Sequence, residues 1–198
     1  MGLFTKIFGR SNSTNNNLNF EKSSKLLDED LYWKIIANSL TTSSNQDQQL
    51  KSLVSQLLKL SPLEIVGFKL TTYKLLYEIY NSETWCAGYI INGGCSDDGF
   101  EYFRCWIISK GKNVYYQAKS SPDNLVDELN DEIEEYEFED FLYVANDAFA
   151  NKTKKDIYDF LDNNNFNEGK VNIDFTWEED KPETLKAICP RLFEAKWN

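Results

Sequence analysis

Apolar residues recur at intervals of three and four positions early in the chain, and this spacing constrains the fold more than any other feature. Between residues 28 and 80 it marks out three segments, each with one apolar face. Because an α-helix turns once every ~3.6 residues, the spacing predicts three amphipathic helices. The stretch Ser61-Pro62-Leu63-Glu64 marks the start of the third. Serine caps a helix, proline suits its first turn, and Glu64 can complete a capping box.

The rest of the chain continues the helical pattern, with one exception near the C-terminus. Apolar and polar residues alternate over residues 171–177, which is typical of a strand. A lone strand is unstable, so we expect this segment to lie extended on the helices. The prediction is a mostly α, single-domain bundle of about seven to nine helices, with at most this one short extended segment. Further helices are predicted at residues 84–91, 96–109, 113–119, about 138–149, 154–161 and 183–196.

Residues 1–25 differ in composition from the rest of the chain. Residues 11–19 are rich in asparagine and serine, which is typical of a linker. Leu3, Phe4, Ile7 and Phe8 would share one face of a helix in residues 1–10. That face predicts a weak peripheral contact with a membrane or a partner, or otherwise a frayed tail. We expect residues 1–25 to be a disordered leader and linker, and residues 26–198 to form the helical domain.

Charge and composition exclude several classes of function. The chain has 21 lysines and arginines, 32 acidic residues and no histidine, so its net charge is −11. This balance argues against nucleic acid as a partner, because phosphates are bound by lysine and arginine. The absence of histidine excludes Ser-His-Asp hydrolases, Cys-His proteases and zinc sites that use imidazole. No cofactor is expected.

The spacing of the cysteines and the hydropathy of the chain indicate the cellular compartment of the protein. The four cysteines, Cys86, Cys95, Cys105 and Cys189, form no Cys-x-x-Cys pair and lie among apolar residues. Such spacing is typical of small buried side chains rather than a zinc cage or redox dithiol. No stretch reaches the ~20 apolar residues of a membrane span, so no stable membrane insertion is expected. The prediction is a reduced, cytoplasmic protein.

One segment is acidic throughout. Residues 127–140 contain nine acidic residues and no basic residue. This density predicts a surface that attracts a basic protein partner, such as a toxin nuclease, by electrostatic steering. The alternative is a solvated, flexible face with no partner.

The densest motif runs from Trp85 to Gly111. Two glycines and a Ser-Asp-Asp triplet are followed by Phe-x-x-Phe-Arg-x-Trp and an aliphatic pair. This motif resembles the bacterial family named domain of unknown function 4240, and the resemblance extends over about residues 28–150, leaving 151–198 as a C-terminal extension. It implies a helical bacterial protein and no assigned activity. The motif residues are Trp85, Ala87, Ile90, Ile91, Gly93, Gly94, Ser96, Asp97, Asp98, Phe100, Phe103, Arg104, Trp106, Ile107, Ile108 and Gly111, with a similar stretch at Ser121-Pro122-Asp123-Asn124-Leu125.

The motif can be interpreted as a site. Asp97 and Asp98 could bind a divalent cation, or act as acid and base, and Arg104 could hold a carboxylate or phosphate. Aromatic residues nearby could stack on a flat ligand. These aromatic candidates are Trp85, Tyr102 and Trp106.

The same motif can also be purely structural. Ser96 is a typical N-cap, and acids in a first turn suit the helix dipole. Phe100 and Phe103 fit a core stripe, and Arg104 could form a buried pair that holds the packing together. Gly93 and Gly94 can supply the positive φ that ends a helix.

Two functional hypotheses follow. The first is a soluble bacterial interaction protein or immunity-type protein without catalytic activity, which uses its acidic surface. It is favoured by the missing histidine and the absence of a catalytic signature. The alternative is a ligand- or metal-binding domain, or an enzyme, with its site at Asp97, Asp98 and Arg104.

Overall fold

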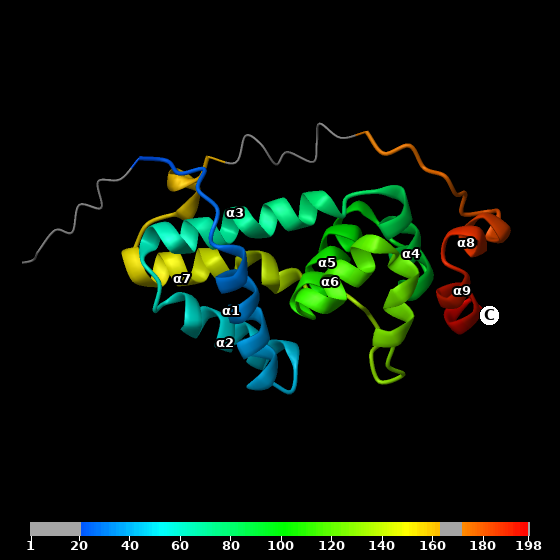
Figure 1. The fold of residues 1–198 in the computed structure, drawn as a ribbon, viewed down its shortest axis with the longest axis horizontal. Coiled ribbons are helices and arrows are strands. Elements are labelled where there is room, and N and C mark those ends of the chain that lie inside the picture. The colour runs from blue at the N-terminus through cyan, green and yellow to red at the C-terminus, as the bar shows by residue number, and fades with distance from the viewer. Residues whose placement is uncertain (1–20, 163–171, 198) are drawn as a thin grey trace, which may run out of the picture.

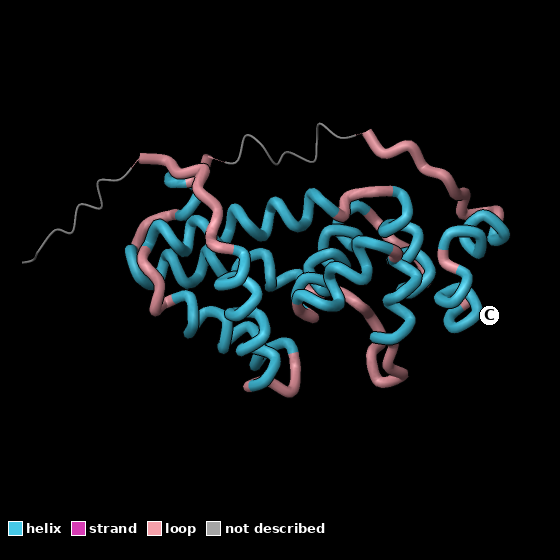
Figure 2. Tube along the Cα trace, in the orientation of Figure 1, coloured by secondary structure: helices cyan, strands magenta, loops and turns pink. Residues whose placement is uncertain are grey.

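The computed structural model describes residues 21–162 and 172–197, and within these ranges the chain is built from helices and loops. It contains nine α-helices and three short 3₁₀ helices there, and the only β-type pairing is an isolated bridge between Ser23 and Leu161 (Figures 1 and 2). The predicted mostly α bundle is therefore confirmed. The helices are α1 (Glu29–Thr41), α2 (Gln46–Leu57), α3 (Pro62–Glu78), α4 (Ser82–Asn92), α5 (Asp97–Ser109), α6 (Lys112–Ser120), η1 (Pro122–Glu128), η2 (Glu139–Tyr143), α7 (Val144–Thr153), η3 (Ile157–Phe160), α8 (Pro182–Ile188) and α9 (Pro190–Lys196).

Local signals in the sequence locate most helix ends. Ser61 and Glu64 form the predicted capping box at the start of α3. Gly93 ends α4 in the left-handed conformation, with φ of 68°. The predicted helix around 138–149 is instead divided into η2 and α7. Phe138 lies outside both, with φ of −148°, because its amide bonds the carbonyl of Tyr102 on α5.

Helix α3 is the centre of the molecule. Residues 65–72 are all buried, so this part of the helix is covered on every side, with α7 alongside it (Figure 1). The chain before α1 covers α3 at Gly67, where the Leu27 amide donates to the Gly67 carbonyl at 3.1 Å. A Cβ atom at Gly67 would lie 2.9 Å from the Leu27 nitrogen, so only glycine permits this approach.

The C-terminal helices α8 and α9 pack on α4 and η1, at the end of the molecule away from α1 and α2 (Figure 1). The residues before them, 172–181, form neither helix nor strand. Trp177 anchors them: its ring is buried, and its indole nitrogen donates to the Ser82 carbonyl at 2.9 Å. The leader and linker were predicted over residues 1–25, of which 1–20 lie outside the described residues. In the described part, Ser23 forms the isolated bridge with Leu161. Of the helices that are described, none has both the length and the apolar character needed to cross a membrane.

The capping box at α3 gives a testable prediction. Replacing Ser61 with alanine should cost about 0.5–2 kcal/mol in unfolding free energy. Hydrogen bonds from Ser61 lower the pKa of Glu64. The stability that they contribute is therefore complete above the unfolded pKa of about 4.3, and is lost as the pH falls through the folded value. Urea unfolding should show a smaller cost for Ser61→Ala near pH ~3 than at pH ~7.

Ser55→Ala is the control for this measurement. Ser55 is exposed within α2 and caps no helix, so its replacement should change stability little and equally at both pH values. A cost of Ser61→Ala that does not vary with pH would contradict the role of the ionised Glu64.

Candidate functional site

The Ser-Asp-Asp triplet forms the first turn of α5. The Ser96 hydroxyl accepts the Gly99 amide at 3.1 Å, which makes Ser96 the N-cap. Asp97 and Asp98 follow it and are exposed. Their carboxylates interact favourably with the positive end of the helix dipole. The two aspartates therefore lie on the surface, at the end of α5 where free backbone N–H groups are found.

Arg104 lies in the interior, two turns further along α5. Its side chain is only 1 % exposed, and it is the largest of the fully buried side chains. The guanidinium donates to the carbonyls of Leu76 at 3.0 Å and Phe100 at 3.2 Å. It also lies over the rings of Tyr80 and Phe100, at 4.8 and 4.5 Å from their centroids. The first of these carbonyls belongs to the last turn of α3, where a cation is favourable.

The three candidate aromatic residues have different environments. Trp85 is buried, stacks on Phe100 at 4.2 Å and donates to the Cys95 carbonyl at 3.1 Å. Trp106 is buried and stacks on Phe103 at 5.8 Å. Tyr102 is half-buried at the surface. The structure thus places Trp85, Phe100, Phe103 and Trp106 in the core and Tyr102 at its edge.

The acidic segment is held in place by two aromatic side chains within it. Tyr136 is fully buried and meets the edge of Trp106 at 5.1 Å. Its hydroxyl bonds both the amide and the carbonyl of Asn130, at 2.7 and 2.8 Å. The amide of Phe138 bonds the Tyr102 carbonyl at 3.0 Å. Residues 130–138 are therefore fixed against α5, while most of their carboxylates point outward.

The acidic segment and the start of α5 form one surface. A Cβ atom on Gly99, in the first turn of α5, would lie 3.0 Å from a carboxylate oxygen of Glu137. Burial, Glu135 and Glu139 raise the pKa of Glu137. Burial, Glu139 and Asp98 raise the pKa of Tyr102 to about 12. We call the exposed carboxylates of residues 127–140, together with Asp97 and Asp98, the acidic surface.

Few basic groups neutralise the acidic surface. Seven of the nine acids in residues 127–140 are exposed, and Glu128 and Glu137 are half-buried. Among the described parts of the chain, only Asp127 of these nine forms an ion pair, with Arg191 of α9 at 2.7 Å. The other carboxylates are free to attract a basic group.

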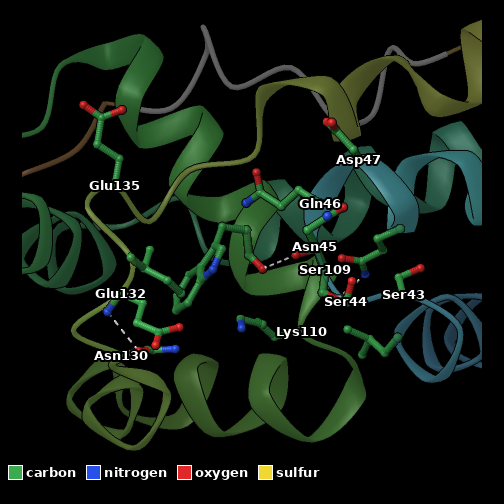
Figure 3. A pocket seen from close by; sticks show the side chains of 14 residues that line it. Ser43, Ser44, Asn45, Gln46, Asp47, Ser109, Lys110, Asn130, Glu132 and Glu135 are labelled. Carbon is green, nitrogen blue, oxygen red and sulfur yellow. Dashed lines mark hydrogen bonds between the residues drawn. The ribbon is translucent and has the colours of Figure 1, made fainter.

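A polar pocket of about 760 Å³ lies beside the acidic surface (Figure 3). Three regions of the chain line it: the α1–α2 connection with the start of α2, the end of α5, and the acidic segment. Of the predicted site residues, only Trp106 lines this pocket. One wall is closed by Gln46, whose amide donates to the Glu137 carbonyl at 2.7 Å. The lining residues are Leu40, Ser43, Ser44, Asn45, Gln46, Asp47, Gln49, Trp106, Ser109, Lys110, Asn130, Glu132, Ile133 and Glu135.

The pocket carries charges of both signs. Lys110 is its only basic lining residue, and its ammonium lies 5.4 Å from the Trp106 ring centroid. Lys110 and Glu132 point toward one another in Figure 3. Buried Gln49 fixes the floor by donating to Ser39 and to the Ser109 carbonyl, at 3.2 and 2.8 Å. In residues 21–162 and 172–197, no group of three or more cysteine, aspartate or glutamate side chains could hold a metal ion.

Sequence reasoning missed the residues that organise the site. Tyr136 and Phe138 alternate with glutamates, and this period of two indicates an extended segment with one buried face. Asp123, in the second motif stretch, is buried and accepts the amides of Arg191 and Leu192, at 3.2 and 2.9 Å. It thereby holds α9 on η1. Nothing in the local sequence indicates that partner, because it lies nearly seventy positions away.

The fold and the site define an all-α protein with one acidic surface and an adjoining polar pocket. The chain belongs to the family described as Protein of unknown function (DUF4240), whose pattern matches residues 27–151. The match confirms the resemblance seen in the motif residues, and it leaves α8 and α9 outside. No curated protein and no solved structure matches the chain.

The burial of Arg104 gives a second prediction. Arg104→Gln should leave the Leu76 carbonyl without its donor, and an unpaired buried group costs about 1–3 kcal/mol. Asp97→Asn and Asp98→Asn, at the exposed first turn, should each change stability by less than about 1 kcal/mol. Urea unfolding of the three variants tests this order. Equal losses in all three would show that Arg104 does not hold α5 against α3.

Proposed function

We propose that this protein binds a basic protein partner through its acidic surface and has no catalytic activity of its own. The observation that carries the proposal is the geometry of residues 130–138. They are fixed by buried Tyr136 and Phe138, yet they expose carboxylates that no base neutralises in the described chain. A fixed array of like charges costs folding free energy through repulsion, which is expected where a partner supplies the opposite charge.

Contacts within the molecule support this proposal. Arg191 of α9 pairs with Asp127, and the Lys196 ammonium lies 5.3 Å from the centre of the Tyr136 ring. One edge of the acidic surface therefore already accommodates a basic helix. We infer that the remaining part accepts basic side chains of a partner in the same way.

The net charge of −11 supports rapid association with such a partner. Steering by complementary charge raises association rates and weakens at high salt. A bacterial immunity-type protein that neutralises a basic nuclease in the cytoplasm is one function of this kind.

The test is affinity capture from the native host with quantitative mass spectrometry. We expect the wild type to recover one basic protein in stoichiometric amount at low salt, and less of it at high salt. Neutralising the exposed acids beside the pocket should abolish the capture. The substitutions are Asp131→Asn, Glu132→Gln, Glu134→Gln and Glu135→Gln, which raise the net charge by four.

A matched control separates local charge from total charge. A second variant neutralises four exposed acids elsewhere, and it has the same net charge as the first. It should capture the partner like the wild type. Equal loss in both variants, or no stoichiometric partner for the wild type, would contradict the proposal. The control substitutions are Glu21→Gln, Asp159→Asn, Asp174→Asn and Asp180→Asn.

The pocket favours a second candidate function, which is the binding of a small polar ligand. Its volume of about 760 Å³ and its opposed Lys110 and Glu132 suit a zwitterion such as an amino acid or short peptide. This candidate differs from the predicted site at Asp97, Asp98 and Arg104, because the pocket contains none of these three residues.

Thermal unfolding with single amino acids and dipeptides tests the second candidate. A ligand at ~100 times its Kd should stabilise the folded state by about 2.7 kcal/mol. Lys110→Met and Glu132→Gln should each reduce this gain. Lys59→Met, an exposed lysine outside the pocket, should not. A gain that survives both pocket substitutions would place the ligand elsewhere.

A further inference from the structure

A buried lysine lies at the junction of α3, η2 and α7, far along α3 from its capping box. Lys69 is only 2 % exposed. Its ammonium donates to the carbonyl of Leu142 at 2.5 Å and lies 4.8 Å from the Tyr73 ring centroid. Among the described residues, Lys69 forms no ion pair with a carboxylate. The charge of this ammonium is therefore only partly compensated, which is costly inside a protein.

One further group approaches this ammonium, and it reaches the surface. Tyr158 of η3 is 49 % exposed, and its ring centroid lies 5.8 Å from the Lys69 nitrogen. Tyr158 therefore joins a buried positive charge to the solvent.

We propose that Tyr158, resting on the buried Lys69 ammonium, is the nucleophilic modification site of this protein and takes electrophilic acyl, phosphoryl or sulfonyl donors. The ammonium would gain a counter-charge when the phenol ionises, so the phenolate is stabilised where it forms. Tyr158 is 49 % exposed, so a donor can approach this residue from the solvent. This inference does not depend on the proposed function.

The tyrosine pKa values agree with this geometry. Hydrogen bonding to Asn146, the Lys69 charge and Tyr73 outweigh burial and lower the pKa of Tyr158. The surroundings of six other tyrosines, Tyr32, Tyr89, Tyr102, Tyr115, Tyr116 and Tyr143, raise their pKa instead. Burial and Glu29 raise the pKa of Tyr116 to about 12, and burial with Glu139 raises that of Tyr143. Burial also lowers the pKa of Lys69 itself.

The surrounding charges do not reverse the lowering of the Tyr158 pKa. Asp156, next to η3, opposes ionisation of Tyr158. The negative charge of Glu101 on α5 acts to raise the pKa of Lys69 and the pKa of Tyr143. The remaining titratable groups that face the pair are Tyr73 of α3, Cys105 of α5 and Tyr143 of η2.

The reaction with a sulfonyl donor can be written in full. The Tyr158 phenol gives its proton to water, and the phenolate oxygen attacks the sulfur of an arylsulfonyl fluoride. An S–O bond forms, the S–F bond breaks and fluoride leaves. No oxidant or reductant is required. Acyl and phosphoryl donors react in the same way, with their own leaving group in place of fluoride.

The experiment is labelling of the intact protein with an arylsulfonyl fluoride, followed by peptide mapping over a range of pH. Tyr158 should be labelled at least about tenfold faster than Tyr116 and Tyr143, since each pKa unit changes the phenolate fraction tenfold. Its rate should also reach half of its maximum at a lower pH than theirs. Equal rates and equal pH profiles for these exposed tyrosines would overturn the proposal, as would labelling at Lys69.

Substitution of Lys69 tests whether its charge causes the fast labelling of Tyr158. Lys69→Met keeps the length and loses the charge, so labelling of Tyr158 should fall about tenfold per pKa unit restored. Lys74→Met, one turn further along α3, should leave the rate unchanged. Undiminished labelling in Lys69→Met would overturn the proposal. If circular dichroism shows that Lys69→Met is unfolded, the pH profiles of the wild type decide the question alone.

Discussion

The structure depends on the burial of the middle of α3, where residues 65–72 are all buried. A helix covered on every side cannot leave its polar groups to water, so each must find a partner inside the protein. Thr71 and Thr72 bond carbonyls of the preceding turn, at 2.9 and 3.0 Å. Near the C-terminal end, the Leu75 carbonyl accepts the Tyr115 hydroxyl at 2.8 Å, and the Leu76 carbonyl accepts Arg104. Side chains of α5 and α6 thus donate the hydrogen bonds that these two carbonyls of α3 accept.

These contacts position the rest of the molecule. Arg104 fixes α5 against the end of α3, so the first turn of α5 meets the acidic segment and Trp106 meets Tyr136. Lys69, the other cation buried with α3, fixes the junction of η2 and α7 instead. The acidic surface, the pocket and the Lys69–Tyr158 pair are therefore all consequences of how one buried helix satisfies its polar groups.

The sequence predicted elements whose signals are local. Capping residues and apolar spacing located α1 to α5, and the residues of the central motif were enough to identify the family. Groups that depend on distant partners could not be predicted this way. Arg104 bonds a carbonyl 28 positions away, and Lys69 bonds one 73 positions away. A sequence pattern gives the face of a helix but not the neighbour that covers it.

Under the proposed function, the C-terminal extension limits where a partner can bind on the acidic surface. Helix α9 lies outside the family match, yet it pairs Arg191 with Asp127 and places Lys196 over Tyr136. The Asp127 end of the segment is therefore already covered by a basic helix. The exposed carboxylates around Glu132 carry no such cover in the described chain, and they border the pocket. A partner would then bind at this end, where its basic side chains also reach the pocket mouth.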